Sequence, residues 1–75
     1  MITATQCRMA RAALGWGVRD LAKKAGVSVT TITRFETQQS EPIRATLTVV
    51  QQTFEAAGIE FTNGDVPGVR VHTRK

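Results

Sequence analysis

Few side chains in this sequence are suited to covalent or acid–base chemistry. The chain has one histidine, one cysteine and no tyrosine, and His72 and Cys7 lie near its opposite ends. No cluster of histidine, cysteine and carboxylate residues has metal-ligand spacing, and no glycine-rich phosphate loop follows a strand. We therefore expect no catalytic residues, no metal and no cofactor, and predict that the protein is not an enzyme. A lone Cys7 has no partner for an internal disulfide and is expected to be a small core residue.

Residues 18–36 are instead suited to holding one helix at a steep angle to another. Ala22 is small, so a following helix can cross close to it. Gly26 can take the positive φ that a tight turn demands, and Val27 can fill the angle between the helices. Ser28 can accept hydrogen bonds from the first amide groups of the next helix. These features predict a helix-turn-helix unit.

The outward face of the second of these helices has the chemistry of base recognition. Ile32 and Phe35 are expected to face the core. An arginine can bind guanine through two hydrogen bonds, and threonine or valine can contact a thymine methyl group. Exposed threonine and arginine also occur on ordinary solvated helices, so this face alone leaves both interpretations open. The residues predicted to contact bases are Val29, Thr30, Thr33 and Arg34.

The excess of positive over negative charge lies wholly in the first part of the chain. The net charge is +4, and residues 1–44 hold seven basic and three acidic side chains, whereas residues 45–75 hold three of each. Such asymmetry fits a surface that binds a polyanion. The longest apolar runs are far shorter than the roughly 20 residues of a membrane-spanning helix, so we expect no membrane association.

The elements that must position these residues follow from apolar periodicity. Helices are predicted over residues 4–14, 18–25, 28–36 and 43–57, the last with Ile43, Leu47, Val50, Phe54 and Ala57 facing inward. After Gly58 the apolar period changes to two, which predicts strands over residues 59–62 and 68–72, with turn chemistry at Asn63-Gly64-Asp65. Seventy-five residues predict a single domain over residues 1–75.

The two short strands raise the question of what covers them. A two-stranded hairpin is marginal in water by itself, so it must pack on the last helix or pair with another chain. Both arrangements remain open at this point. One hypothesis is that the strands help to build a two-fold dimer, with Ile59, Phe61, Val69 and Val71 at the interface.

The order of these motifs resembles the XRE-like family of phage-repressor and Cro-type helix-turn-helix regulators. The resemblance covers roughly residues 5–57. It rests on Leu14-Gly15-Trp16, on Gly26-Val27-Ser28, on Ile32-Thr-Arg-Phe-Glu36, and on Glu41-Pro42 followed by Leu47. It implies a mainly α fold: a four-helix repressor-like helix-turn-helix domain, here followed by a short C-terminal β-hairpin or strand pair. Gly17 stands where the family usually has a polar helix cap, and Val18 where it often has a glutamine that touches DNA.

The family resemblance also implies roles for individual residues. Residues 28–36 become the recognition helix. Arg11 and Glu36 are expected to form a structural ion pair that fastens the first helix to the recognition helix. Contacts to the DNA backbone are expected from Ser28, Arg19, Lys23, Thr37, Gln38, Gln39 and Arg44.

Together these features predict a transcriptional regulator that binds double-stranded DNA. A homodimer would place two recognition helices about 34–36 Å apart and read a pseudo-palindromic operator. The expected location is the cytoplasm, for a bacterial or phage-encoded protein that associates with the nucleoid through DNA binding. The alternative is an antitoxin-like or anti-regulator module that uses the same scaffold to hold a protein partner.

Overall fold

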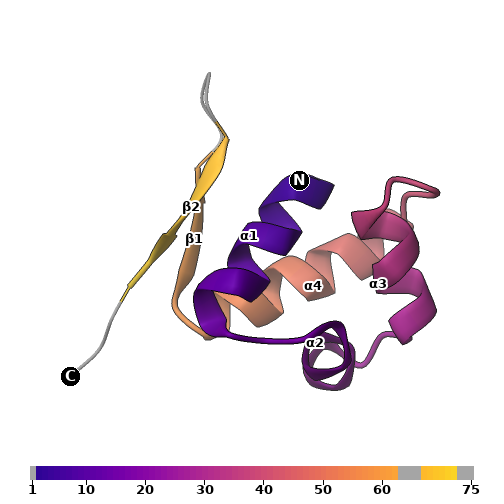
Figure 1. The fold of residues 1–75 in the computed structure, drawn as a ribbon, viewed down its shortest axis with the longest axis horizontal. Coiled ribbons are helices and arrows are strands. Elements are labelled where there is room, and N and C mark those ends of the chain that lie inside the picture. Colours follow the sequence, from indigo (N-terminus) through magenta and orange to yellow (C-terminus); the bar gives the residue numbers. More distant parts are fainter. Residues whose placement is uncertain (1, 63–66, 73–75) are drawn as a thin grey trace.

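Four helices followed by an antiparallel hairpin make up the computed structural model, which describes residues 2–62 and 67–72 (Figure 1). This arrangement confirms the predicted mainly α fold with a C-terminal hairpin. The helices are α1 (Ala4–Leu14), α2 (Val18–Ala25), α3 (Val29–Glu36) and α4 (Arg44–Ala56), and the strands are β1 (Ile59–Thr62) and β2 (Gly68–Val71).

Side-chain caps fix where the first three helices begin. Thr3 and Gln6 form a reciprocal capping box at the start of α1. The Asp20 carboxylate accepts a hydrogen bond of 2.8 Å from the Gly17 amide, which supports a helix start that glycine alone would leave weak. Ser28 is the cap of α3 and accepts from the Thr31 amide at 3.1 Å, so the helix itself begins at Val29 rather than at residue 28.

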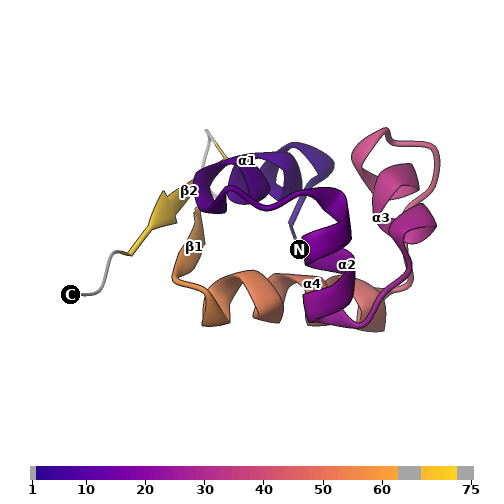
Figure 2. The ribbon, with the colours of Figure 1, turned by 60° about the horizontal axis from the view of Figure 1, so that its bottom comes forward.

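The core lies between the four helices, and the hairpin closes one end of it by packing on α1 and α4 (Figure 2). Phe54 of α4 is fully buried at its centre. Its ring stacks on Trp16 with centroids 5.7 Å apart and meets the edge of Phe61 at 5.9 Å. This aromatic row ties the α1–α2 connection and β1 to the same helix. Other buried side chains come from every helix, among them Cys7, Leu21, Ile32, Phe35, Leu47 and Val50.

Ile43 departs from the predicted inward stripe of the fourth helix. It is the N-cap residue of α4, in an extended conformation, and 73% of its surface is exposed. The stripe that reaches the core begins one turn later, at Leu47. Ile43 satisfies the apolar period in the sequence, but it precedes the first helical turn and lies beyond the edge of the core.

The hairpin strands pair within the chain, which answers the question left open by the sequence. Ile59 lies opposite Val71 and Phe61 opposite Val69 in the antiparallel register. β2 packs on α1 and β1 on α4. The predicted turn at residues 63–65 lies outside the described residues.

A buried glutamine joins the hairpin to the first helix. The Gln6 side-chain amide donates to the carbonyl oxygens of Thr62, at 3.0 Å, and Gly68, at 3.2 Å. Its side-chain oxygen accepts from the Thr3 amide at 2.9 Å. One side chain therefore caps α1 and bonds to both members of the strand pair Thr62 and Gly68.

The opposite end of the hairpin closes on a glycine. The His72 amide donates to the Gly58 carbonyl oxygen at 2.7 Å. Gly58 has φ +98°, and a Cβ at this position would lie 2.8 Å from the His72 carbonyl oxygen. Only glycine fits this approach of two backbones without a shift.

Three of the four residues assigned to a dimer interface are used within the chain. Ile59 is only 3% exposed and belongs to the core, which corrects its assignment to an interface between chains. Phe61 and Val69 are partly buried against the same core, and Val71 remains 48% exposed. The inward face of the hairpin is covered by α1 and α4 of its own chain.

No helix among residues 2–62 and 67–72 combines the length and the apolar character needed to cross a membrane.

Candidate nucleic-acid interface

The turn between α2 and α3 sets the angle of the second helix. Gly26 has φ +69°, the left-handed conformation that ends α2, and the Val27 amide donates back to the Ala22 carbonyl oxygen at 3.0 Å. Val27 is half-buried and packs against the core beside the crossing. The chain then enters α3 directly through the Ser28 cap. The turn therefore joins two short helices that run in different directions: in Figure 1 α2 is seen nearly end-on and α3 from the side.

α3 is divided lengthwise into a buried side and an exposed side. Ile32, Phe35 and Glu36 are buried. The four residues predicted to contact bases all lie on the exposed side, and three of them are short: Val29, Thr30, Thr33 and Arg34. The structure thus brings these four together on one helix face.

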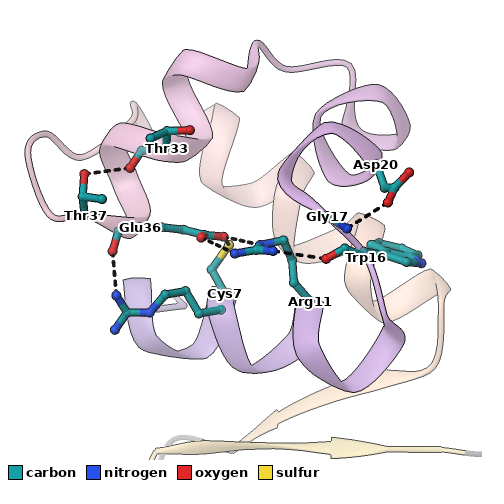
Figure 3. A network of polar contacts seen from close by, with 9 residues as sticks. Cys7, Arg11, Trp16, Gly17, Asp20, Thr33, Glu36 and Thr37 are labelled. Carbon is teal, nitrogen blue, oxygen red and sulfur yellow. Dashed lines mark hydrogen bonds and ion pairs between the residues drawn. The ribbon is translucent and has the colours of Figure 1, made fainter.

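The residues predicted to contact the DNA backbone come from the elements next to α3 in the chain, and all are exposed. Arg19 and Lys23 belong to α2, Arg44 begins α4, and the remainder lie at the cap and in the α3–α4 loop: Ser28, Thr37, Gln38 and Gln39. Two of their hydroxyl groups are already engaged. The Thr37 hydroxyl donates to the Thr33 carbonyl oxygen at 2.8 Å (Figure 3), and the Ser28 hydroxyl caps α3.

Arg11 and Glu36 form an ion pair with two hydrogen bonds (Figure 3). Arg11 Nε donates to Glu36 Oε2 at 2.7 Å, and Nη2 donates to Oε1 at 2.6 Å. Arg11 Nη1 also donates to the Trp16 carbonyl oxygen at 3.1 Å. The bonds to Glu36 raise the pKa of Arg11 above its ordinary value. The pair fastens α1 to the last turn of α3, and Arg11 is committed to this contact.

Cys7 completes the buried side of the pair. Its Sγ donates to Glu36 Oε2 at 3.2 Å, and its side chain has no exposed surface. Burial, together with the Glu36 carboxylate, raises the pKa of the thiol well above its ordinary range. Cys7 is therefore a neutral hydrogen-bond donor that supports the carboxylate.

Arg8 also holds the end of α3, a role that the sequence did not predict. Its Nη1 donates to the Glu36 carbonyl oxygen at 3.0 Å, at the C-terminal end of α3. A positive charge at this end of a helix is favourable. Arg8 precedes Arg11 by one helical turn, a spacing that places both on one face of α1 and could have indicated a shared target.

The last carbonyl oxygens of α3 all have donors. Those of Thr33, Arg34 and Phe35 accept from amides of the α3–α4 loop, where Gln38 takes the left-handed conformation with φ 61°. That of Glu36 accepts from Arg8. Together with the Ser28 cap, these bonds hold both ends of α3 in place.

Two short helices joined by a tight glycine turn, with the second braced at both ends and exposed along one side, define a DNA-binding protein of the helix-turn-helix class. The helix-turn-helix family model matches residues 8–49, more than half of the chain. The chain therefore belongs to the XRE family of helix-turn-helix domains, which bind DNA and are non-catalytic. No curated protein matches the chain.

Proposed function

We propose that the protein is a sequence-specific regulator of transcription that inserts α3 into the major groove of double-stranded DNA. On this proposal it binds a pseudo-palindromic operator as a dimer. The observation that carries the proposal is the exposed side of α3, where Val29, Thr30 and Thr33 are short enough to let the helix axis approach the base edges. Arg34 lies one helical turn after Thr30 and is long enough to reach a guanine.

The bracing of α3 favours base reading. A side chain held on a fixed helix loses less conformational freedom when it binds than one on a loop. The cap at Ser28 and the bonds from Arg8 and Arg11 to Glu36 fix both ends of α3 before DNA arrives. The four proposed base contacts therefore keep a constant spacing.

The start of α4 is a proposed phosphate contact. None of the described side chains caps its first amide groups. Free amide groups at a helix start favour an anion, and Arg44 adds a positive charge at the same place. Arg19, Lys23 and the loop of Thr37, Gln38 and Gln39 extend the proposed backbone contacts on either side of α3.

Selection of binding sites from random duplex DNA tests this function. We expect enrichment of an inverted repeat whose half-sites lie about one helical turn apart. Failure to enrich any sequence, with only weak salt-sensitive binding, would contradict sequence-specific recognition. It would favour the alternative, a module that uses the same scaffold to hold a protein partner.

Replacing Arg34 tests the assignment of base contacts. Arg34→Ala should weaken binding to the selected operator by about 1–3 kcal/mol and relax the preference at one base position. The matched control is Arg70→Ala, which removes the same charge from exposed β2. Equal weakening on operator and random DNA would make Arg34 a phosphate contact instead.

A further inference from the structure

Arg8 of α1 is exposed, and its contact with α3 uses only part of its hydrogen-bonding capacity. Its Nη1 donates to the Glu36 carbonyl oxygen at 3.0 Å, and this is the one side-chain hydrogen bond that Arg8 makes within the described part of the chain. A guanidinium has several N–H groups, which point in fixed directions in one plane. Arg8 can therefore bind a further acceptor without releasing α3.

The charge of Arg8 also remains available. In the part of the chain that the structure describes, no carboxylate lies within ion-pair distance of its guanidinium. The Glu36 carboxylate is held by Arg11, and Glu41 of the α3–α4 loop is exposed. Arg8 is therefore a cation bound to a neutral carbonyl group, whereas the charge of Arg11 is balanced within the protein.

The other basic side chains of the four helices already have a contact or a proposed one. Arg11 is held in its ion pair. Lys24 Nζ lies 5.1 Å from the centroid of the Trp16 ring, beside α4. Proposed DNA contacts account for the rest: Arg19, Lys23, Arg34 and Arg44. Arg8 is the exposed helical cation that the proposed function leaves without a role on DNA.

The C-terminal end of α3 needs a cation if a phosphate is to lie beside it. Consecutive amides of the α3–α4 loop already donate to carbonyl oxygens of α3: those of Thr37, Gln38, Gln39 and Ser40. The Thr37 hydroxyl is also used, because it donates to the Thr33 carbonyl oxygen at 2.8 Å (Figure 3). The side chains of Gln38 and Gln39 carry no charge, and the carbonyl end of a helix is unfavourable to an anion.

We propose that Arg8 binds a phosphate of the DNA backbone at this end of α3 while it holds the Glu36 carbonyl group. That carbonyl belongs to the peptide bond between Glu36 and Thr37, and Thr37 is itself a proposed backbone contact. The guanidinium therefore lies where the proposed function brings the DNA strand past α3. The inference rests on that function and adds to it a backbone contact from α1.

The double contact sets the position of α3 relative to the DNA strand. The guanidinium is rigid and planar, so a phosphate oxygen and the Glu36 carbonyl oxygen bound to it keep a fixed separation. A lysine carries the same charge on one flexible ammonium group and imposes no such geometry. Arg8 should therefore add to affinity through its charge and to base discrimination through its shape.

The salt dependence of binding to a duplex with a single half-site tests the charge. Each phosphate contact from a basic side chain adds about 0.9 to the slope of log affinity against log salt. Arg8→Met should therefore lower the magnitude of the slope by about 1, and Arg8→Lys should keep it. The matched control is Arg70→Met, the same change on exposed β2, which should leave the slope unchanged. An unchanged slope in Arg8→Met, or an equal fall in Arg70→Met, overturns the proposal.

A second uncharged variant separates loss of the phosphate contact from loss of folding. Arg8→Gln keeps a side-chain N–H donor on α1, and glutamine is a good helix former. Circular dichroism verifies the fold. Folded Arg8→Gln should show the same fall in slope as Arg8→Met. If it is folded and keeps the wild-type slope, Arg8 only braces α3 and contacts no phosphate.

Comparison of the selected half-site with random duplex tests the positioning role. Arg8→Lys should bind random duplex about as tightly as the wild type does, because the charge is kept. Its ratio of half-site affinity to random-duplex affinity should fall several-fold, because α3 is no longer held at a fixed distance from the strand. A wild-type ratio in Arg8→Lys would contradict the positioning role.

Random duplex also distinguishes this inference from the function on which it rests. If the wild type enriches no sequence, the proposed base reading fails, whereas the slopes of Arg8→Met and Arg70→Met on random duplex still decide the phosphate contact. If the wild type enriches an operator and Arg8→Met keeps the wild-type slope, the proposed function stands and the contact from α1 is wrong.

Discussion

At the residue scale, Glu36 concentrates the strongest polar contacts of the molecule. Its carboxylate accepts hydrogen bonds from Arg11 and Cys7, and its backbone carbonyl oxygen accepts one from Arg8. The Glu36 side chain is 6% exposed, so its charge is tolerable only because these donors surround it. α1 and α3 are joined through this one residue.

Removal of Arg11 should therefore be costly. Arg11→Met is expected to lower the free energy of unfolding by about 3–5 kcal/mol, because it leaves a buried carboxylate without its counter-charge. Urea denaturation at neutral pH measures the change.

The double variant Arg11→Met with Glu36→Gln provides the comparison, since it removes both charges together. It should recover part of the loss. A single variant as stable as the wild type would mean that water solvates the carboxylate in place of Arg11.

The thiol of Cys7 should make the protein less stable as the pH rises into the alkaline range. Its pKa is raised in the folded protein above the ordinary 9.0, by burial first and by Glu36 second. As the pH rises above 9, the unfolded chain releases this proton while the folded chain keeps it. The unfolded state then binds fewer protons, so stability falls with rising pH.

Comparison with Cys7→Ala isolates this effect. Between pH 7 and pH 10 the free energy of unfolding should fall by about 1.4 kcal/mol more in the wild type than in Cys7→Ala. The reason is that pH 10 lies one unit above the ordinary thiol pKa of 9.0, which applies to the unfolded chain. Denaturant unfolding at the two pH values gives the difference. Identical losses in the two proteins would show that the folded thiol ionises freely.

At the scale of elements, one side chain of α1 is hydrogen-bonded to both strands of the hairpin. The Gln6 amide group donates to one carbonyl oxygen from each strand, and its oxygen belongs to the capping box of α1. Substitution of this residue can separate the two roles. A carboxylate at the same position keeps the acceptor for the Thr3 amide but has no donor for the strands.

Gln6→Glu should accordingly loosen the hairpin while leaving the helix start intact. We expect a loss of about 1–3 kcal/mol from unsatisfied strand carbonyl groups. Amide hydrogen exchange of β1 and β2 should accelerate more than that of α1. Gln39→Glu, the same change in the exposed α3–α4 loop, is the control and should alter neither. Equal acceleration in α1 and the strands would show that the hairpin has no separate stability.

At the scale of the whole molecule, the basic side chains of residues 1–44 differ in how far they are free of other contacts. Arg19 and Lys23 of α2 and Arg44 of α4 are exposed, whereas Arg11 is held by Glu36. The positive charge of residues 1–44 thus divides into a structural part and an exposed part. Only the exposed part can replace counterions on DNA.

The salt dependence of operator binding should report the exposed part. If Arg19, Lys23 and Arg44 of each subunit contact phosphates, the slope of log affinity against log salt is about −5 for a dimer. Arg44→Gln should reduce its magnitude by about 2, and Arg70→Gln should leave it unchanged. The slope is measured by titrations at several salt concentrations. An unaltered slope in Arg44→Gln would remove Arg44 from the proposed phosphate contacts.

The sequence by itself predicted the helices, the turn and the exposed side of α3. These features depend on nearby residues: apolar spacing, the glycines that end helices, and the Ser28 cap. Their helix and strand bounds differ from the structure by about one residue, as at Ser28 and Ile43. Local patterns can determine them because the responsible interactions span only a few residues.

Only the tertiary structure decided which segments far apart in the sequence contact one another. Arg8 meets Glu36 across 28 positions, and Gln6 meets Thr62 across 56. Ile59 is in the core because α1 and α4 cover the hairpin of their own chain, although its alternation fitted an interface between chains equally well. Periodicity shows that a face must be covered, and only the packing of the whole chain shows what covers it.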